Sequence, residues 1–372
     1  MKNRRKLLSV IFSAIMLALC LSLCACDLPF GRRDPAPLPA PHLIGESEAE
    51  KEPVRKIDEK KERAVVGNSF YERQLSLVET VYDGYRPSFS EEAADVKELY
   101  DTAISVLNRY IKNDFTQYET VHAIHDYIAY NTGYDEELYL KYLDDPKSVS
   151  NSHNSFNLAG VLKDRLAVCD GISKTFNLLC GIEGIRAVRI EGEYAGGAHA
   201  WNKVEIDGEW YNVDVTLDSA RIDVNGSKGQ YLHHGFFLVS DDDIKSSPYG
   251  AHRADPSYGA NPVNFDAPKT YPVYESLEID IDGESYPSLI TSSSELKNLL
   301  VAATKAGRKK IGKIDVRIEI TGVDLSKEDA FDSLFDAALK EAKTIDFMLD
   351  EDRGIRPFVR YPNGATLILL YV

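Results

Sequence analysis

Two segments that alternate between apolar and polar residues, 198–206 and 209–217, constrain the fold more than any other part of this 372-residue chain. Alternation with a period of two is typical of β-strands. Between the segments stands Asp207-Gly208, a dipeptide that favours the tight two-residue turn of a β-hairpin. The sequence therefore predicts an antiparallel pair of strands in which Ile206 faces Glu209.

The same register brings a histidine and an aspartate to one face of the hairpin. It places Trp201 opposite Asp214, and His199 has the parity of Trp201. His199 and Asp214 therefore form a diagonal pair about 7–8 Å apart at the backbone, which an imidazole–carboxylate hydrogen bond can span. A three-residue loop would reverse the parity and separate them. Gly196-Gly197 leaves this face open for another element to approach.

A cysteine precedes the hairpin in a helical context. From Cys169 to Cys180 apolar residues recur at helical spacing, and Gly181 and Gly184 are typical stop signals. We expect Cys169 in the first turn of a buried helix, where free N–H groups and the helix dipole favour a thiolate. Cys180 lies about 16 Å further along, too far for a disulfide, and is interpreted as a core residue. Cysteine, histidine and aspartate placed in this way meet the geometric requirement of a Cys–His–Asp triad.

The neighbours of these three residues resemble a known family. C-D-G at 169–171, G-G-x-H-A-W-N-x-V at 196–204 and D-G-x-W-Y-x-V-D-V-T at 207–216 are similar to motifs of the transglutaminase-like superfamily, with similarity from about Phe70 to Val239. The resemblance implies an α+β fold with a papain-like core, in which N-terminal helices and a central cysteine-bearing helix pack on an antiparallel sheet. It also implies that Cys169 is the nucleophile, His199 the general base and Asp214 the residue that orients the base.

Two positions depart from the family pattern. Leu217 follows D-V-T, where family members often have tryptophan. Classical transglutaminases also place a tryptophan ahead of the nucleophile to stabilise the oxyanion, whereas Trp201 and Trp210 both follow Cys169. We therefore expect an acyl-enzyme that is resolved by water in preference to an amine.

Polar residues outside the three motifs are weaker candidates for function. Tyr130, Asn154 and Asn157 are candidate donors to an oxyanion, although such residues more commonly form turns. His122 and His125 lie one helical turn apart, but no third ligand lies near them in the sequence. We expect one of the two to pack and the other to be exposed, interpret the pair at 233–234 in the same way, and predict neither a metal nor a cofactor.

Residues 1–25 are expected to be a lipoprotein signal peptide. Basic residues 2–6 precede an apolar run, and Leu23-Cys24-Ala25-Cys26 resembles a bacterial lipobox in which Cys26 becomes the lipidated N-terminus. The alternative is an uncleaved signal anchor, since the run is close to the roughly 17 residues that a membrane span requires. Both alternatives place the body of the protein outside the cytoplasm, and the first attaches it to the cell membrane through lipid.

Composition divides the rest of the chain. Residues 26–66 are rich in proline and then in charge, which predicts a disordered tether. Residues 67–270 are expected to form the transglutaminase-like domain. Within it we expect three helices between Asn68 and Asn131, a polar loop over 135–157 and an exit from the core over 246–272.

Residues 271–372 are expected to form a small accessory α+β domain with the order ββαβαββ. Its predicted elements are hairpins around Asp282-Gly283 and Asn363-Gly364, helices over 292–307 and 325–342, and a strand over 314–320.

The net charge of −16 argues against nucleic acid as a partner. We therefore expect a monomeric enzyme that acts on amide bonds of peptide or protein substrates, cell-wall peptide included, as a peptidase or amidase. One alternative is a transamidase that cross-links proteins. The other is a non-catalytic module that binds a peptide or cell-wall fragment on the same fold.

Overall fold

The computed structural model describes residues 55–224, 227–232, 234–245, 251–259, 265–275, 278–281, 283–307, 312–319, 355–361 and 364–371, and single positions at 333, 337 and 340. The expected signal peptide, Cys26 and most of the expected tether lie outside the described residues, as does most of the helix expected over 325–342. Among the described residues, no helix is both long enough and apolar enough to cross a bilayer.

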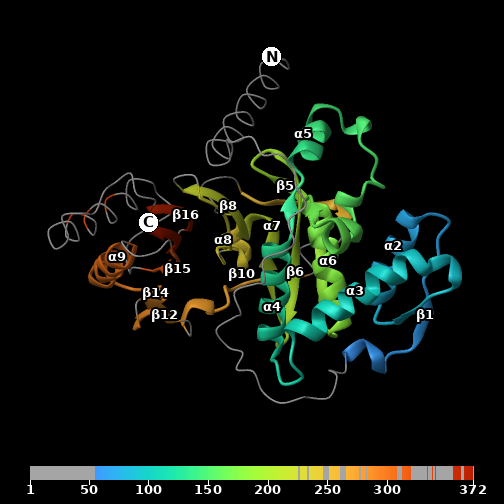
Figure 1. Cartoon of the computed structure of the whole chain (residues 1–372), viewed down its shortest axis with the longest axis horizontal. Coiled ribbons are helices and arrows are strands. Elements are labelled where there is room, and N and C mark those ends of the chain that lie inside the picture. The colour runs from blue at the N-terminus through green and yellow to red at the C-terminus, as the bar shows by residue number, and fades with distance from the viewer. Residues whose placement is uncertain are drawn as a thin grey trace.

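A five-stranded antiparallel sheet lies at the centre of the protein (Figure 1). Its order is β10-β7-β6-β5-β11, with bounds β5 (Ala187–Tyr194), β6 (Gly197–Ile206), β7 (Glu209–Val213), β10 (Phe237–Val239) and β11 (Arg253–Gly259). Strands β6 and β7 form the expected hairpin, with Ile206 paired to Glu209. The tight turn requires positive φ at both central positions, and Asp207 and Gly208 have φ of 53° and 84°.

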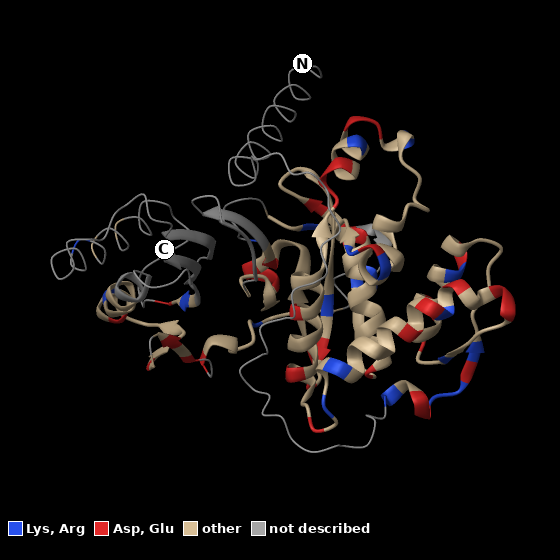
Figure 2. Ribbon diagram, viewed as in Figure 1, with Lys and Arg blue, Asp and Glu red and all other residues tan. Residues whose placement is uncertain are grey.

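Helix α6 (Cys169–Ile182) packs on this sheet and begins at the residue expected from the sequence. It contacts β5 and β6 of the sheet, and it also contacts α2 and α4. Figure 2 shows few charged residues along it, and both of them, Asp170 and Lys174, lie near its start. Phe176 and Cys180 expose none of their surface. The mixed α and β fold, with a cysteine-bearing helix on an antiparallel sheet, is the one expected.

The three N-terminal helices are also confirmed, as α2 (Phe70–Tyr82), α3 (Ala94–Tyr110) and α4 (Gln117–Asn131). Their side chains join α6 in one hydrophobic core. A Cβ atom on Gly181 would lie 2.6 Å from Cγ1 of Val81 in α2. Glycine at this position therefore allows α2 and α6 to pack closely.

The structure corrects the end of the expected tether, because residues 55–66 belong to the folded domain. A 3-10 turn, η1 (Lys56–Glu59), is followed by β1 (Glu62–Ala64), which pairs in parallel with β2 (Arg86–Ser88). Ile57 is 1% exposed and belongs to the hydrophobic core. Charged neighbours obscure this single apolar residue in the sequence, and its packing partners lie far along the chain.

The expected polar loop over 135–157 is wrong. It contains α5 (Glu136–Asp144) and the turns η3 (Pro146–Ser148) and η4 (Asn154–Phe156). Asp135 caps α5, since its side chain accepts a hydrogen bond from the Leu138 amide.

Residues 246–272 do not simply leave the core, because they include β11, an edge strand paired with β5. Pro256 obscures this strand in the sequence, yet proline is tolerated at a sheet edge. The part of the chain between residues 133 and 245 also contains β3 (Gly133–Tyr134), η5 (Gly160–Asp164), β4 (Leu166–Ala167), α7 (Val215–Asp218), β8 (Ser219–Val224), β9 (Ser227–Leu232) and α8 (Asp241–Lys245).

The C-terminal part contains a second sheet with the order β14-β15-β17-β16. Its elements, after the short turn η7 (Val273–Glu275), are β12 (Glu278–Ile281), β13 (Glu284–Pro287), β14 (Leu289–Ile290), α9 (Ser293–Gly307), β15 (Gly312–Ile318), β16 (Ile355–Tyr361) and β17 (Gly364–Tyr371). Both expected hairpins, the helix over 292–307 and the strand near 314–320 are confirmed.

Candidate active site

Cys169 lies in the first turn of α6, where backbone N–H groups have no partner within the helix. The residue is 7% exposed. A Cβ atom on Gly171 would lie 2.5 Å from the carbonyl oxygen of Ser155 in η4. Glycine at this position of the C-D-G motif therefore lets the start of α6 lie directly against the turn that precedes it in the chain.

The other cysteine of the described region has no comparable surroundings. Cys169 and Cys180 are both free thiols. Burial raises the pKa of Cys180 well above its ordinary value, and the charge of Glu183 raises it further. Cys180 therefore remains a neutral thiol in the core, as the sequence predicts.

His199 connects Cys169 to Asp214. It lies on β6, its Nε2 atom is 2.6 Å from Oδ2 of Asp214, and its ring lies close enough to Cys169 for that side chain to raise its pKa. Nδ1 is the ring nitrogen left for the thiol. The predicted contact between His199 and Asp214 is therefore confirmed, but the strand expected over 209–217 is wrong after Val213, because β7 ends there and Asp214 caps α7.

The imidazole of His199 is held in its charged form. Burial lowers its pKa, but the charges of Asp214 and Cys169 outweigh burial and raise it to about 10. At neutral pH His199 is therefore an imidazolium placed between a carboxylate and the cysteine sulfur.

Asp214 caps α7 and is 1% exposed. Its Oδ1 atom accepts a hydrogen bond from the Leu217 amide, while Oδ2 faces two histidines. Burial alone would raise the pKa of Asp214, but His199 and His252 lower it below its usual range. Leu217 stands where family members often have tryptophan, and it contacts Asp214 through its backbone amide. Any residue except proline can supply this amide.

His252 is the second histidine at this carboxylate, and the sequence argument missed it. Its Nε2 atom is 2.8 Å from Oδ2 of Asp214, and its Nδ1 atom is 3.1 Å from the Ile244 carbonyl oxygen. Burial lowers its pKa and Asp214 partly offsets that change. Nothing in the sequence indicates His252, because it directly precedes β11, the edge strand whose proline hides the strand in the sequence.

Two tyrosines lie beside the cysteine. Burial together with the nearby Cys169 raises the pKa of Tyr134 well above its usual value. Burial and Cys169 also raise the pKa of Tyr139 to about 12. A Cβ atom on Gly197 would lie 2.6 Å from the Tyr139 hydroxyl. The approach predicted at Gly196-Gly197 is therefore made by Tyr139 of α5.

The amides expected near the thiol are used elsewhere. Nδ2 of Asn154 donates to Asp164, and Nδ2 of Asn157 donates to the carbonyl oxygens of Asn151 and His153. Tyr130 lies in α4. The phenols that the structure places close enough to Cys169 for that residue to raise their pKa are those of Tyr134 in β3 and Tyr139 in α5.

Groups of three histidine and aspartate side chains with their ligand-type atoms close together occur in two places among the described residues. Ligand-type atoms of His199, Asp214 and His252 lie within 4.8 Å of one another, and so do those of His122, Asp126 and His234. In the first group both histidines face the same oxygen of Asp214, as expected for a network of hydrogen bonds centred on one carboxylate.

A cysteine at the start of a buried helix, paired with a histidine and an aspartate on an antiparallel hairpin, is typical of the papain-like and transglutaminase-like class. Residues 104–215 match the family model described as "Transglutaminase-like superfamily". This match is narrower than the region expected from the sequence, but it contains all three motif residues. The chain therefore contains a transglutaminase-like domain.

Known proteins resemble part of this chain. Kyphoscoliosis peptidase of Mus musculus is 26% identical over 134 residues, and that of Homo sapiens is 25% identical over 137 residues. These alignments cover 33% and 34% of this chain but only 19% of each relative. A solved TGase structure is 23% identical with a TM-score of 0.29, and the match covers 34% of this chain and 33% of the TGase.

Proposed function

We propose that this protein is a cysteine enzyme in which Cys169, His199 and Asp214 act as a catalytic triad on amide bonds of peptide or protein substrates. The observation that carries the proposal is the position of His199, which is hydrogen-bonded to Asp214 and close enough to Cys169 for that side chain to raise its pKa. An imidazolium in that place stabilises a thiolate and stands ready to protonate a leaving amine. The names of the two peptidase relatives agree with this chemistry.

The reaction follows from these contacts. The Cys169 thiolate attacks the amide carbonyl and forms a carbon–sulfur bond, and the carbonyl oxygen becomes an oxyanion. The oxyanion accepts hydrogen bonds from the Cys169 backbone N–H and from the Tyr134 hydroxyl, which takes the place of the upstream tryptophan. His199 gives its proton to the leaving nitrogen, the carbon–nitrogen bond breaks, and a thioester remains.

Water resolves the thioester. Neutral His199 removes a proton from the water as it attacks, the carbon–sulfur bond breaks, and the acid leaves while the thiolate–imidazolium pair is restored. Asp214 keeps the ring oriented throughout and remains ionised. An amine acceptor in place of water would give the transamidase alternative by the same steps.

The experiment is a mass-spectrometric screen of a peptide mixture, with the full chain compared with Cys169→Ala and Cys180→Ala. We expect products only when Cys169 is present, and we expect Cys180→Ala to retain activity because that thiol is buried and neutral. Added amine distinguishes the outcomes, since a hydrolase yields free acids and a transamidase yields amine adducts. Equal turnover by Cys169→Ala would overturn the triad.

One observation favours the alternative of a non-catalytic binding module. Cys169 is only 7% exposed, so little of its surface is open to a substrate. The binding module predicts that Cys169→Ala binds the same peptides or cell-wall fragments as the wild type and that neither protein turns them over. Equilibrium binding measured beside the screen distinguishes the two functions.

We also propose that the enzyme works outside the cytoplasm, attached to the membrane through lipid on Cys26. The support is the sequence of residues 1–26 alone. Metabolic labelling with a fatty acid should mark the wild-type chain and leave Cys26→Ser unmarked. Labelling of both chains, or of neither, would overturn the assignment.

A further inference from the structure

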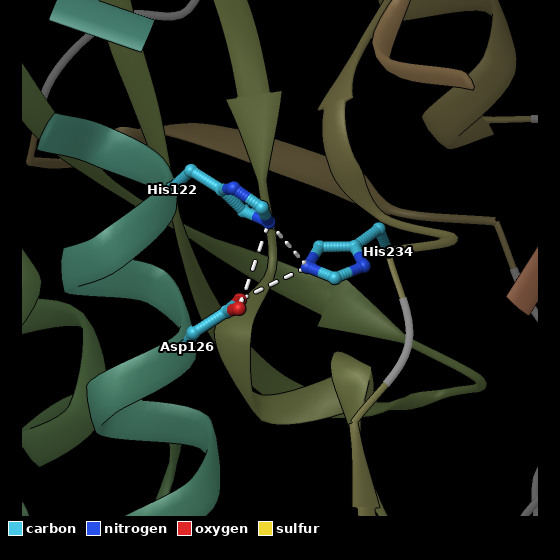
Figure 3. Close-up of side chains that lie close together, drawn as sticks. All are labelled: His122, Asp126 and His234. Carbon is cyan, nitrogen blue, oxygen red and sulfur yellow. Dashed lines mark hydrogen bonds and ion pairs between the residues drawn. The ribbon is translucent and has the colours of Figure 1, made fainter. Parts of the chain in front are cut away.

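Three side chains outside the thiol site direct their polar atoms toward one another. His122 and Asp126 lie one turn apart on α4, and His234 lies in the segment before β10 (Figure 3). The Nε2 atoms of the two histidines are 3.0 Å apart. Oxygens of Asp126 lie 2.9 Å from Nε2 of His234 and 3.6 Å from Nε2 of His122.

Hydrogen bonds alone satisfy this arrangement poorly. Each Nε2 atom faces the other and also faces the carboxylate, yet a ring nitrogen carries at most one proton. A proton directed at Asp126 is not directed at the other ring, and two protonated rings would repel each other. A cation between the three groups would use the lone pairs of both nitrogens and of the carboxylate oxygen at once.

The spacing matches that of a tetrahedral zinc site. Zinc binds imidazole nitrogen and carboxylate oxygen at about 2.0–2.2 Å, so that two ligand atoms of one tetrahedron lie about 3.3 Å apart. The two Nε2 atoms are 3.0 Å apart, close to this value. Each also lies near a carboxylate oxygen of Asp126, that of His234 at 2.9 Å from Oδ1 and that of His122 at 3.6 Å from Oδ2. The side chains of His122, Asp126 and His234 are 24%, 30% and 12% exposed, which leaves solvent access for a fourth ligand.

A second layer of groups fixes the carboxylate. Nδ1 of His125 lies 2.9 Å from Oδ1 of Asp126, and Nε2 of His125 lies 3.0 Å from Oδ2 of Asp218. The side chains of His125 and Asp218 are fully buried. Asp218 in turn accepts a hydrogen bond of 2.8 Å from the Phe236 amide. Oriented outer groups of this kind are typical of metal ligands.

We propose that His122, Asp126 and His234 bind one divalent transition-metal ion, with zinc as the best fit to two imidazoles and one carboxylate. Two ligands come from α4 and the third from the segment that leads into β10. The Phe236 carbonyl oxygen of that segment accepts a hydrogen bond from the Asp214 amide. The ion would therefore fasten α4 to the backbone that supports Asp214.

The sequence offered half of this site. The spacing of His122 and His125 drew attention to α4, but the argument against a metal rested on the missing third ligand. In the structure the second candidate ligand on α4 is Asp126, since His125 is buried behind the site. The third candidate ligand is His234, from a segment that is distant in sequence. His125 is packed, as expected for one histidine of the pair, whereas His122 is only partly exposed, with 24% of its side-chain surface accessible.

The test is zinc titration of the purified, tag-free full chain by calorimetry, together with metal analysis after dialysis. We expect one equivalent of zinc for the wild type and for His153→Gln, an exposed histidine elsewhere. We expect loss of that equivalent in His122→Gln and Asp126→Asn, and an affinity about 10–100-fold weaker in His125→Gln. Cobalt in the same site should give the intense visible absorption of tetrahedral coordination.

Thermal unfolding keeps the test decisive if a variant is unstable. Zinc should raise the Tm of the wild type above its value in chelator, since an ion that binds only the folded state stabilises it. It should leave the Tm of His122→Gln unchanged. Absence of stoichiometric binding by the wild type, or equal binding by His122→Gln and Asp126→Asn, would overturn the site and identify a hydrogen-bonded cluster instead. None of these readouts depends on catalysis by Cys169.

Discussion

The Nε2 atom of His252 lies 2.8 Å from Oδ2 of Asp214, the same oxygen that lies 2.6 Å from Nε2 of His199. One carboxylate oxygen therefore faces two imidazoles, one raised in pKa and the other lowered. Both ring nitrogens of His252 face acceptors, Oδ2 of Asp214 and the Ile244 carbonyl oxygen, so its neutral form donates to only one of them. With the proton on Nε2, His252 donates to Asp214 and holds the carboxylate in place, while His199 carries the positive charge.

Replacement of His252 by phenylalanine should impair catalysis without removing the nucleophile. A hydrogen bond to a charged group contributes about 1.5–3 kcal/mol, which corresponds to a fall of about 10–100-fold in kcat/KM. His252→Gln, which retains an N–H donor, should recover part of the loss. The measurement is kcat/KM against pH for the three proteins, and identical profiles for phenylalanine and glutamine would show that the hydrogen bond is not used.

Alkylation of Cys169 should depend on His199. The imidazolium beside the sulfur favours the thiolate, so iodoacetamide should modify the wild type at neutral pH and should react at least about tenfold more slowly with His199→Gln. Mass spectrometry distinguishes the peptide of Cys169 from that of Cys180, which should stay unlabelled in the folded protein because it is fully buried. Equal rates in both proteins would show that the two side chains do not interact in solution.

The charge on His199 should also appear in the pH dependence of stability. Its pKa of about 10 in the folded protein exceeds the ordinary value of about 6.5, so its contribution is complete below pH 6.5 and is lost as pH rises toward 10. Urea unfolding at pH 6, 8 and 10 should show the advantage of the wild type over His199→Gln shrinking by a few kcal/mol, an order-of-magnitude figure. A difference that stays constant with pH would contradict the raised pKa.

Glycine 171 should be intolerant of a methyl group. In Gly171→Ala the new Cβ would meet the backbone oxygens of Ser155 and Asn157 at 2.5 and 3.0 Å, and backbone cannot move aside cheaply. We expect a loss of about 1–3 kcal/mol in the free energy of unfolding, measured with urea. Gly197→Ala is the matched control, because its new Cβ would meet the movable Tyr139 hydroxyl and should cost less stability.

The beginning of the described region should matter for stability. Arg55 is buried, with Nη1 2.6 Å from Glu183 and Nη2 3.3 Å from the Ile111 carbonyl oxygen. Arg55→Ala would leave the mostly buried carboxylate of Glu183 without its charged partner. We expect the free energy of unfolding to fall by about 3–5 kcal/mol.

Adding Glu183→Gln to Arg55→Ala should restore part of that stability, because the stranded charge is removed. If residues before Asn68 were a tether, neither variant would change the unfolding midpoint.

The local sequence determined the parts of the site that depend on periodicity and turn chemistry. Asp207-Gly208 specifies a two-residue turn, and the resulting hairpin register brings His199 near Asp214, the residue that directly follows β7. Glycine stop signals and apolar spacing likewise place Cys169 at the start of α6. These relations need no knowledge of distant partners, because they are geometric consequences of the backbone between neighbouring residues.

Only the tertiary structure decided which distant groups meet these residues. His252, Tyr134 and His234 reach their partners because separate elements pack on one core, and contacts of this kind leave no periodic signal in the chain. Ile57 shows the same limit, since one apolar residue among charged neighbours is buried by packing alone. Local propensity is a property of a few residues, whereas burial and side-chain convergence are properties of the whole folded chain.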